Sequence, residues 1–426
     1  MSEFFEISNR IEELSKKSLE KAAEPLARVS EITEYNQQKV LSSFIKNKVD
    51  ETDFNTSTGY GYSDKGREKL DLLLADILGA ESAIIRAGAL SSGTHTLAVC
   101  LFGILRPGDE MLCVSGTPYD TIHPVIGLGG KNMGDGTLAD FGVIYSQIDL
   151  TETDEFDYEA IEDYVKNNKS VRMVYIQRSR GYSLRHSISV DEIAKVCEIV
   201  HRVNKHAIVM VDNCYGVFTE KKEPTDVGAD LIAGSLIKNM GGGIAPSGGY
   251  IAGRKDLVEL CGYRLTCPGL GTELGATLGQ NRNIFMGIFH APHVVGEALK
   301  TAIFASALFE DLGFKVTPRY NETRHDIIEA ICLENKENLI AFCQGLQKGA
   351  PVDSYVVPEP WDMPGYDSQV IMSAGAFTGG SSIELSADAP LREPYAVWMQ
   401  GGLNFHSGKV GIMLAAEEML KRGLIK

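Results

Sequence analysis

The chain lacks the features that mark secreted scaffolds, membrane proteins and nucleic-acid-binding proteins. Its 8 cysteines form no Cys-x-x-Cys pair and several lie in apolar runs, which favours reduced thiols over a disulfide framework. No segment reaches the roughly 18 continuous apolar residues that a membrane span needs. The net charge of −16, without a long basic run, argues against nucleic acid and anionic membranes as partners. The acidic first residues, MSEFFE, contain no apolar core, so we expect no signal peptide and a cytoplasmic protein.

The composition is that of an ordinary globular protein with more than one domain. Hydrophobic residues make up 44% of the 426 positions, which is sufficient for a large core. Residues 1–55 have helical spacing that is broken at Pro25. In residues 56–295, short β-branched runs alternate with helical runs, which predicts an α/β domain with a mostly parallel central sheet. Residues 296–426 predict a smaller C-terminal α+β domain, in which 323–349 is expected to be helical.

Three polar features lie where the expected strands end or a helix begins. The run AIVMVD ends at Asp212, the run DLIAGSLIK ends at Lys238, and Ser-Ser-Gly-Thr at 91–94 precedes a helix. Because ligands bind at the carboxyl ends of parallel strands, we expect these features to meet at one edge of the sheet. A helix N-terminus can hold a phosphate, a carboxylate can pair with a protonated ring nitrogen, and a lysine can form a Schiff base with an aldehyde. Pyridoxal phosphate needs all three.

Each of these features also has a simpler interpretation. A Ser-Ser-Gly before a helix is usually an N-cap, an aspartate often follows a buried strand, and a strand-end lysine is usually solvated. Their combination in this order favours a pyridoxal phosphate site over three coincidences. No metal site is expected, because His290 and His293 stand three residues apart without further ligands that the spacing places beside them.

Four segments resemble those of a known enzyme family: RAGALSSGTHTL, GTPYDT, VDNCYG and SLIKNMGGG. They resemble the fold-type I pyridoxal phosphate enzymes and, within these, the lyases of cysteine and methionine metabolism. The chain looks most like the branch described as methionine gamma-lyase-like, cystathionine beta-lyase-like or aluminium-resistance proteins. The resemblance covers nearly the whole chain and implies the fold of the pyridoxal phosphate-dependent transferases.

The resemblance also implies a role for individual residues. Lys238 corresponds to the lysine that forms the Schiff base and moves protons, and Asp212 to the partner of the pyridinium nitrogen. Tyr119 corresponds to the tyrosine that stacks on the cofactor ring, although a turn tyrosine is the simpler interpretation. The cofactor phosphate would be held by a set of four residues: Ser92, Gly93, Thr94 and Ser235.

One loop departs from the family pattern. The lyases carry a Tyr-x-Arg pair that reaches the phosphate of the neighbouring subunit, and here the loop is GYGYSD, with Tyr60 and Tyr62 but no arginine. The resemblance implies that this loop comes from the neighbouring chain, so we expect a homodimer or a homotetramer with shared active sites. The missing arginine weakens the transfer of the γ-elimination assignment.

An amino-acid substrate needs a group that holds its α-carboxylate, and a bidentate arginine is the usual solution. In the resembling fold this arginine comes from the small domain, which favours Arg392. The segment QRSRGYS after an expected strand adds Arg178 and Arg180, which could bind the substrate or the phenolic oxygen of the cofactor. Each of the three could also be an ordinary surface arginine.

The sequence therefore predicts a pyridoxal phosphate-dependent carbon–sulfur lyase. It would act on a sulfur amino acid such as cystathionine, methionine or cysteine, by abstraction of the α-proton and β- or γ-elimination. Lys238 would remove the α-proton, and Tyr119 could protonate the leaving sulfur. Two alternatives stay open: another pyridoxal phosphate reaction, such as that of an aldolase or a decarboxylase, and a non-catalytic protein of metal stress on the same scaffold.

Overall fold

The computed structural model describes residues 3–130, 132–362 and 368–425, which form two compact units. The large unit contains residues 36–181 and 187–290. The small unit contains residues 1–35, 182–186 and 291–426. The five residues 182–186 thus belong to the small unit, although the segments on both sides of them belong to the large one. The domain boundaries expected after residues 55 and 295 stay predictions.

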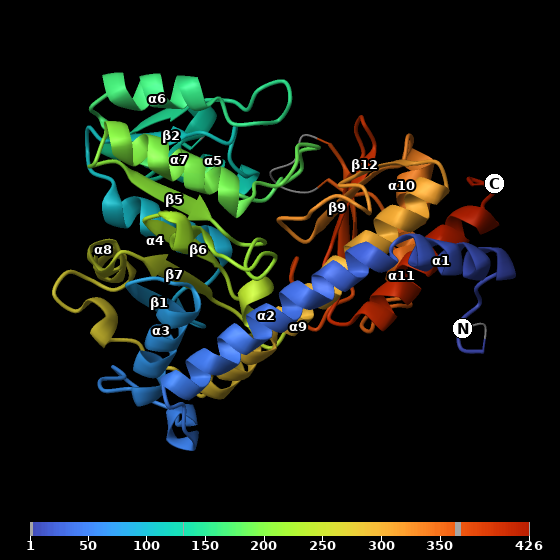
Figure 1. The fold of residues 1–426 in the computed structure, drawn as a ribbon, viewed down its shortest axis with the longest axis horizontal. Coiled ribbons are helices and arrows are strands. Elements are labelled where there is room, and N and C mark those ends of the chain that lie inside the picture. The colour runs from blue at the N-terminus through green and yellow to red at the C-terminus, as the bar shows by residue number, and fades with distance from the viewer. Residues whose placement is uncertain (1–2, 131, 363–367, 426) are drawn as a thin grey trace. The chain divides into compact units, whose positions relative to one another are not determined.

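A seven-stranded sheet forms the centre of the large unit (Figure 1). Its strands are β1 (Ser82–Arg86), β2 (Glu110–Cys113), β3 (Ile144–Gln147), β4 (Val171–Gln177), β5 (Ile208–Asp212), β6 (Leu231–Ser235) and β7 (Gly249–Gly253). Their order is β1-β7-β6-β5-β4-β2-β3. The strands from β2 to β6 pair in parallel, and β7 is antiparallel to β6 and β1. The mostly parallel central sheet predicted from the sequence is confirmed.

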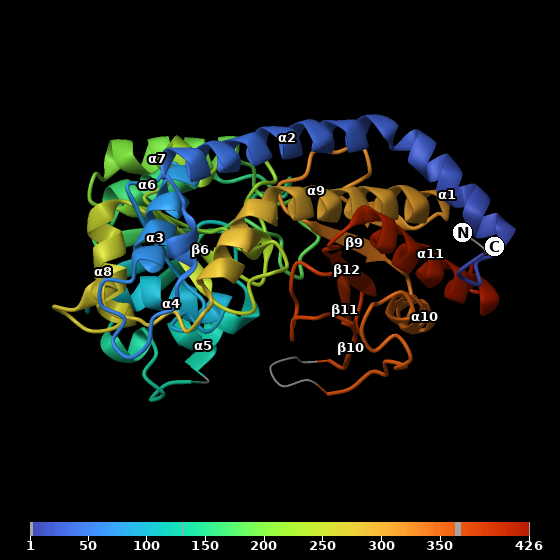
Figure 2. The ribbon, with the colours of Figure 1, turned by 90° about the horizontal axis from the view of Figure 1, so that it is seen from below.

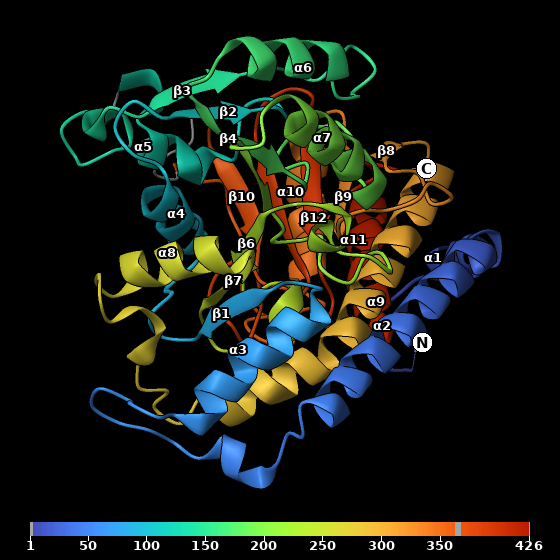
Figure 3. The same cartoon turned by 60° about the vertical axis from the view of Figure 1, so that its left-hand side comes forward.

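The helices of the large unit are α3 (Lys65–Ile77), α4 (Gly93–Ile104), α5 (His123–Ile126), α6 (Tyr158–Asn167), α7 (Val190–Val203) and α8 (Lys255–Leu265). Buried residues of α4 and α8, such as Leu97 and Leu257, cluster with alternate residues of the strands. Helices α6 and α7 lie together, away from α4 and α8 (Figure 3). Apolar side chains of α4 and α8 therefore cover one face of the sheet, as the burial of a mostly parallel sheet requires.

An antiparallel sheet with the order β10-β11-β12-β9-β8 belongs to the small unit (Figure 2). Its strands are β8 (Lys315–Thr317), β9 (Ile328–Cys332), β10 (Val370–Ser373), β11 (Ser386–Pro390) and β12 (Ala396–Gln400). The associated helices are α1 (Asn9–Lys21), α10 (Lys336–Gln347) and α11 (Phe405–Lys421). Two long helices, α2 (Ala23–Lys46) and α9 (Asn281–Asp311), contribute residues to both units. Buried side chains of α9, α10 and α11 form one apolar cluster with alternate residues of the strands.

Two expectations for helices need correction. The break in the N-terminal helical segment lies at Ala22, and Pro25 is in the first turn of α2, where proline is tolerated because no hydrogen bond is lost. The segment 323–349 is not one helix, because it contains β9 before α10. All five residues of β9 are buried and pair with β12, and the last three of them also pair with β8. A short apolar run of this kind has no periodicity that distinguishes a buried strand from a helix.

Among the described residues, no helix combines the length and the apolar character that crossing a membrane requires. All eight cysteines are free thiols, and six of them are buried. The same described residues hold no group of three or more His, Cys, Asp and Glu side chains arranged for a metal ion.

Candidate active site

The carboxyl ends of three neighbouring parallel strands form the edge of the sheet that carries the candidate site. Gln177 ends β4 and is the register partner of Asp212, which ends β5. Asp212 is in turn the register partner of Ala233 in β6, two residues before Ser235. The parallel register thus brings the side chains that the sequence places at strand ends to one edge, as expected.

The first turn of α4 lies against this edge. Ser92 caps the helix by accepting a hydrogen bond from the backbone of His95 at 3.1 Å. A Cβ atom on Gly93 would lie 3.2 Å from Ser235 Cβ and 3.4 Å from Cys214 Sγ. The helix N-terminus therefore approaches the ends of β5 and β6 closely, and a side chain at Gly93 would be tight against both. Backbone amides, the helix dipole and the Ser235 hydroxyl meet in one place, and this set fits a phosphate group.

Asp212 is buried at the end of β5, with 8% of its surface exposed. Burial raises the pKa of this carboxyl, whereas hydrogen bonds from Cys214 and the charge of Lys238 act in the opposite direction. The backbone amide of Cys214 donates to Asp212 Oδ1 at 3.1 Å. A buried carboxylate of this kind is stabilised by a cationic N–H group, so Asp212 fits the ring nitrogen of pyridoxal phosphate.

Lys238 follows β6 and directs its amine to a tyrosine that the sequence did not single out. The amine donates to the hydroxyl of Tyr215 and lies 4.5 Å from the centroid of its ring. The side chain of Asn239 donates to the carbonyls of Tyr215 and Val217, at 2.9 Å each. These bonds join the loop after β6 to the loop after β5. The only sequence signal for Tyr215 was its place in VDNCYG, directly after the strand that ends at Asp212.

Tyr119 lies on a loop that contacts both α4 and the end of β4. Its backbone amide donates to the side-chain oxygen of Gln177. Two residues further on, the Thr121 hydroxyl is 2.8 Å from that of Thr94, in the first turn of α4. A Cβ atom on Gly181 would lie 3.5 Å from the Tyr119 ring. Tyr119 is thus held beside the predicted phosphate residues, and its stacking on the cofactor stays a prediction.

The three candidate arginines have different surroundings. Arg178 is fully buried and donates to Asn213 Oδ1 at 2.8 Å and to Glu220 Oε1 at 2.6 Å, so its guanidinium supports the loop after β5. Arg180 is 1% exposed and directly precedes Gly181. Arg392 is exposed on the turn that follows β11 in the small unit. Substrate binding by any of the three stays a prediction.

The loop with Tyr60 and Tyr62 is fixed through hydrogen bonds to its backbone, while both tyrosine rings are exposed. Arg67 Nη1 donates to the carbonyl of Gly61 at 2.6 Å, and the Gly275 amide donates to that of Tyr60 at 3.0 Å. The two tyrosine rings, 73% and 59% exposed, have centroids 5.8 Å apart. The large unit therefore presents this aromatic pair to its surroundings instead of folding it into its own core.

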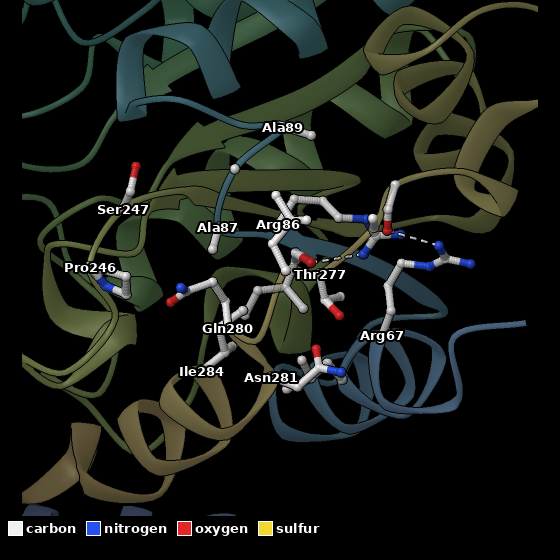
Figure 4. Close-up of a pocket in the computed structure, with 16 residues that line it drawn as sticks. Arg67, Arg86, Ala87, Ala89, Pro246, Ser247, Thr277, Gln280, Asn281 and Ile284 are labelled. Atoms are coloured by element: carbon white, nitrogen blue, oxygen red, sulfur yellow. Dashed lines mark hydrogen bonds between the residues drawn. The ribbon is translucent and has the colours of Figure 1, made fainter. Parts of the chain in front are cut away.

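A cavity of about 310 Å³ adjoins the segment that leads from β1 to α4 (Figure 4). Its lining includes Ala87, Gly88 and Ala89, residues 275–278, 280 and 281, and Arg67 and Arg86. Arg86 forms a two-point ion pair with Asp71, at 2.7 and 2.9 Å. None of the residues predicted to hold the cofactor is among the described residues that line this cavity, so the cavity is separate from the Lys238 site.

Comparison with known proteins gives a consistent picture. Residues 11–420 match the family model of methionine gamma-lyase. The chain is 45% identical to the uncharacterized protein YnbB of Bacillus subtilis, over 93% of each chain. It is similar to the structure of a carbon–sulfur lyase involved in aluminum resistance from Clostridium novyi NT, with 48% identity, a TM-score of 0.93 and coverage of 97% and 96%. At 15% identity and a TM-score of 0.62, the pyridoxal-5'-phosphate dependent protein YhfS of Escherichia coli shares the fold.

Proposed function

The chain belongs to the methionine gamma-lyase family, which indicates a pyridoxal phosphate-type carbon–sulfur lyase, and we propose that it cleaves the C–S bond of a sulfur amino acid. The observation that carries the proposal is the meeting of Lys238, Asp212 and the first turn of α4 at one sheet edge. These residue types are common by themselves, but an amine, a buried carboxylate and a helix N-terminus at the same sheet edge are the set that pyridoxal phosphate requires. The reaction would be a β- or a γ-elimination.

When bound, pyridoxal phosphate supplies an electron sink that makes the α-proton of an amino acid acidic. Lys238 would remove that proton with its amine and return it later in the reaction. Tyr215 would hold the amine in place while it is free, because its hydroxyl already accepts a hydrogen bond from Lys238. Asp212 would keep a proton on the ring nitrogen, since a buried carboxylate without a cationic partner is unfavourable.

The leaving group and the carboxylate need residues of their own. Tyr119 could donate a proton to the departing sulfur, because it lies half-buried beside the first turn of α4. Arg180 is the arginine that we favour for the α-carboxylate, because it is buried in the loop after β4 and directly precedes Gly181, which lies beside the ring of Tyr119. A buried guanidinium binds a carboxylate more strongly than an exposed one, since water competes less.

We also propose that two copies of the chain assemble around the site. The exposed Tyr60–Tyr62 pair, held firmly by Arg67, has the form of a docking element. Size-exclusion chromatography with light scattering should give the molar mass of a dimer or a larger oligomer. Replacing both tyrosines with serine should weaken the dimer, and a monomeric wild-type protein would contradict this part of the proposal.

The test of the function is the absorbance and the product spectrum of the purified protein. The wild type should absorb near the wavelength of a lysine-bound cofactor, and Lys238→Ala should not. Cystathionine, methionine and cysteine are then offered in turn, and release of a thiol with a keto acid supports the lyase. Formation of glycine and an aldehyde from threonine would identify an aldolase instead. A protein that binds no cofactor and changes no amino acid would leave only the non-catalytic alternative.

A further inference from the structure

The segment 182–186, which we call the strap, leaves the large unit after β4 and docks on the small sheet. Its docking face can be identified from the alternation of side chains along the strands. Ala387 and Ala389 of β11, and Val397 and Met399 of β12, point into the helix-covered core. Asp388 and Trp398 lie between them and therefore point to the opposite face, where they are register partners. The strap binds to this pair.

Three contacts fix the strap on the sheet. The hydroxyl of Tyr182 donates to Asp388 Oδ2 at 2.8 Å. The ring of Tyr182 meets that of Trp398 edge to face, with centroids 5.4 Å apart. The indole of Trp398 donates in turn to the carbonyl of Ser183 at 3.3 Å. Asp388 and Trp398 are each 8% exposed, so these contacts are shielded from water, and a charge-assisted hydrogen bond is strong under such conditions.

The residues just before the strap are equally well fixed in the large unit. Gly181 has a φ of +58°, and a Cβ atom there would lie 3.2 Å from Gln177 Nε2 and 3.5 Å from the Tyr119 ring. Gln177 Nε2 also donates to the carbonyl of Ser179 at 3.1 Å. Arg180 stands within this short link, and only two peptide units separate it from Tyr182. Because two peptide units of 3.8 Å each cannot stretch, the anchor at Gly181 and the anchor at Tyr182 together fix the course of the backbone next to Arg180.

We propose that Tyr182 is a positioning residue, whose anchorage on Asp388 and Trp398 sets the orientation of Arg180 toward the substrate carboxylate. The inference rests on the proposed function, since it requires an amino acid as the substrate. A bidentate guanidinium–carboxylate pair depends on orientation more than a point charge does. Small displacements of its backbone therefore weaken substrate binding, while the groups that carry out the chemistry keep their places.

The test compares two tyrosine-to-phenylalanine variants that lose the same kind of hydrogen bond. Tyr182→Phe removes the bond to Asp388 and keeps the ring contact with Trp398. Its KM should rise about tenfold, with kcat within about twofold of the wild type and the cofactor absorbance unchanged. Asp388→Asn should show the same split. The matched control is Tyr164→Phe, because the Tyr164 hydroxyl donates to Glu110 at 2.6 Å at the amino end of β2. Its KM should not change.

A double-mutant cycle identifies the route of the effect. Arg180→Lys alone should raise KM about a hundredfold, because lysine cannot make the bidentate contact. Adding Tyr182→Phe to Arg180→Lys should raise it little further, since the strap acts through Arg180. If the two effects multiply, the strap acts on another group and the proposal is wrong. An unchanged KM in Tyr182→Phe would also overturn it.

A failure of the proposed function has a different signature. If amino acids perturb the cofactor absorbance but no C–S bond is cleaved, the lyase proposal fails, and the strap is still tested by the dissociation constants of the same variants. The fluorescence emission of Trp398, measured in a Trp361→Phe background, gives a second readout. Substrate should change this emission when the strap and Arg180 are unaltered, and it should not change the emission of the Arg180→Lys variant. If no amino acid changes either signal, both proposals are overturned.

Discussion

The two sheets of the molecule offer polar groups in different ways. In the large sheet, β4, β5 and β6 run in parallel, so the polar residues at their carboxyl ends gather along one edge. In the small sheet all pairings are antiparallel, and the polar Asp388 lies within a strand, on a face. A parallel sheet therefore concentrates reactive groups at a point, whereas the antiparallel sheet provides a flat surface on which another segment can be positioned.

This difference suggests a division of labour. Substitutions at the edge of the large sheet should affect cofactor retention and kcat, because the groups there would touch the reacting atoms. Substitutions in the small sheet or in the strap should affect KM, because we propose that the small sheet fixes the strap and thereby Arg180. The following predictions test that division, beginning with the largest effect.

Lys238→Ala should reduce kcat by about 10⁴-fold or more, because under the proposed function it removes the amine that would hold the cofactor and move the proton. Steady-state kinetics and the absorbance spectrum measure the two consequences. Lys255→Ala, at an exposed position at the start of α8, is the matched control and should behave like the wild type. Activity in Lys238→Ala near that of the control would remove the basis for placing the chemistry at this edge.

Asp212→Asn should reduce kcat by about 10²- to 10³-fold and yet stabilise the cofactor-free protein. Burial raises the pKa of Asp212 above its unfolded value, so the ionised carboxylate costs stability above the folded pKa. This cost disappears as the pH falls below the unfolded value, where both states are protonated. Thermal unfolding of the cofactor-free proteins should therefore show a higher Tm for Asp212→Asn at pH 8 and little difference near pH 3. Equal Tm values at both pH values would contradict the assigned burial cost.

Arg180 of the large unit and Arg392 of the small unit are the two candidates to compare for binding the substrate carboxylate. Arg180→Lys should raise KM about a hundredfold, and Arg392→Lys much less, because Arg180 is buried and Arg392 is exposed. Kinetics with one substrate series measures both variants. The reverse ranking would assign the carboxylate to the small unit, as the family resemblance implies.

Tyr215→Phe should have the smallest effect, a decrease of about tenfold in kcat with KM and cofactor content unchanged. The hydroxyl that accepts a hydrogen bond from Lys238 is lost, while the ring beneath the amine is kept. Stopped-flow measurement of the proton-abstraction step locates the loss. A change in KM alone would argue that Tyr215 binds the substrate.

The strand ends were predictable because three independent signals agree there. Asp212 and Lys238 each end an apolar run, and the parallel register that the alternation of elements predicts must bring such ends together. The contact of Gly93 with Ser235 follows from the same arrangement, since a Gly at a helix start permits close approach.

The remaining features depend on contacts between residues that are distant in the sequence. β9 resembles part of a helix until its pairing with β8 and β12 is known. The strap is a five-residue loop whose partner Asp388 is 206 positions away, and no local pattern contains that information. Tyr215 is next to predicted site residues, but the direction of its hydroxyl is a matter of tertiary structure.

The Arg86–Asp71 pair has a consequence for how copies of the chain can meet. β1 is at the margin of the large sheet, and its Ile85 amide donates to Asp71 at 2.9 Å while its carbonyl accepts from Arg86 at 2.8 Å. At Ile85, the backbone groups that a foreign strand would recruit are already occupied by these side chains. The Arg86–Asp71 pair thus hinders edge-to-edge aggregation through β1, and copies of the chain are expected to assemble through surfaces formed by side chains.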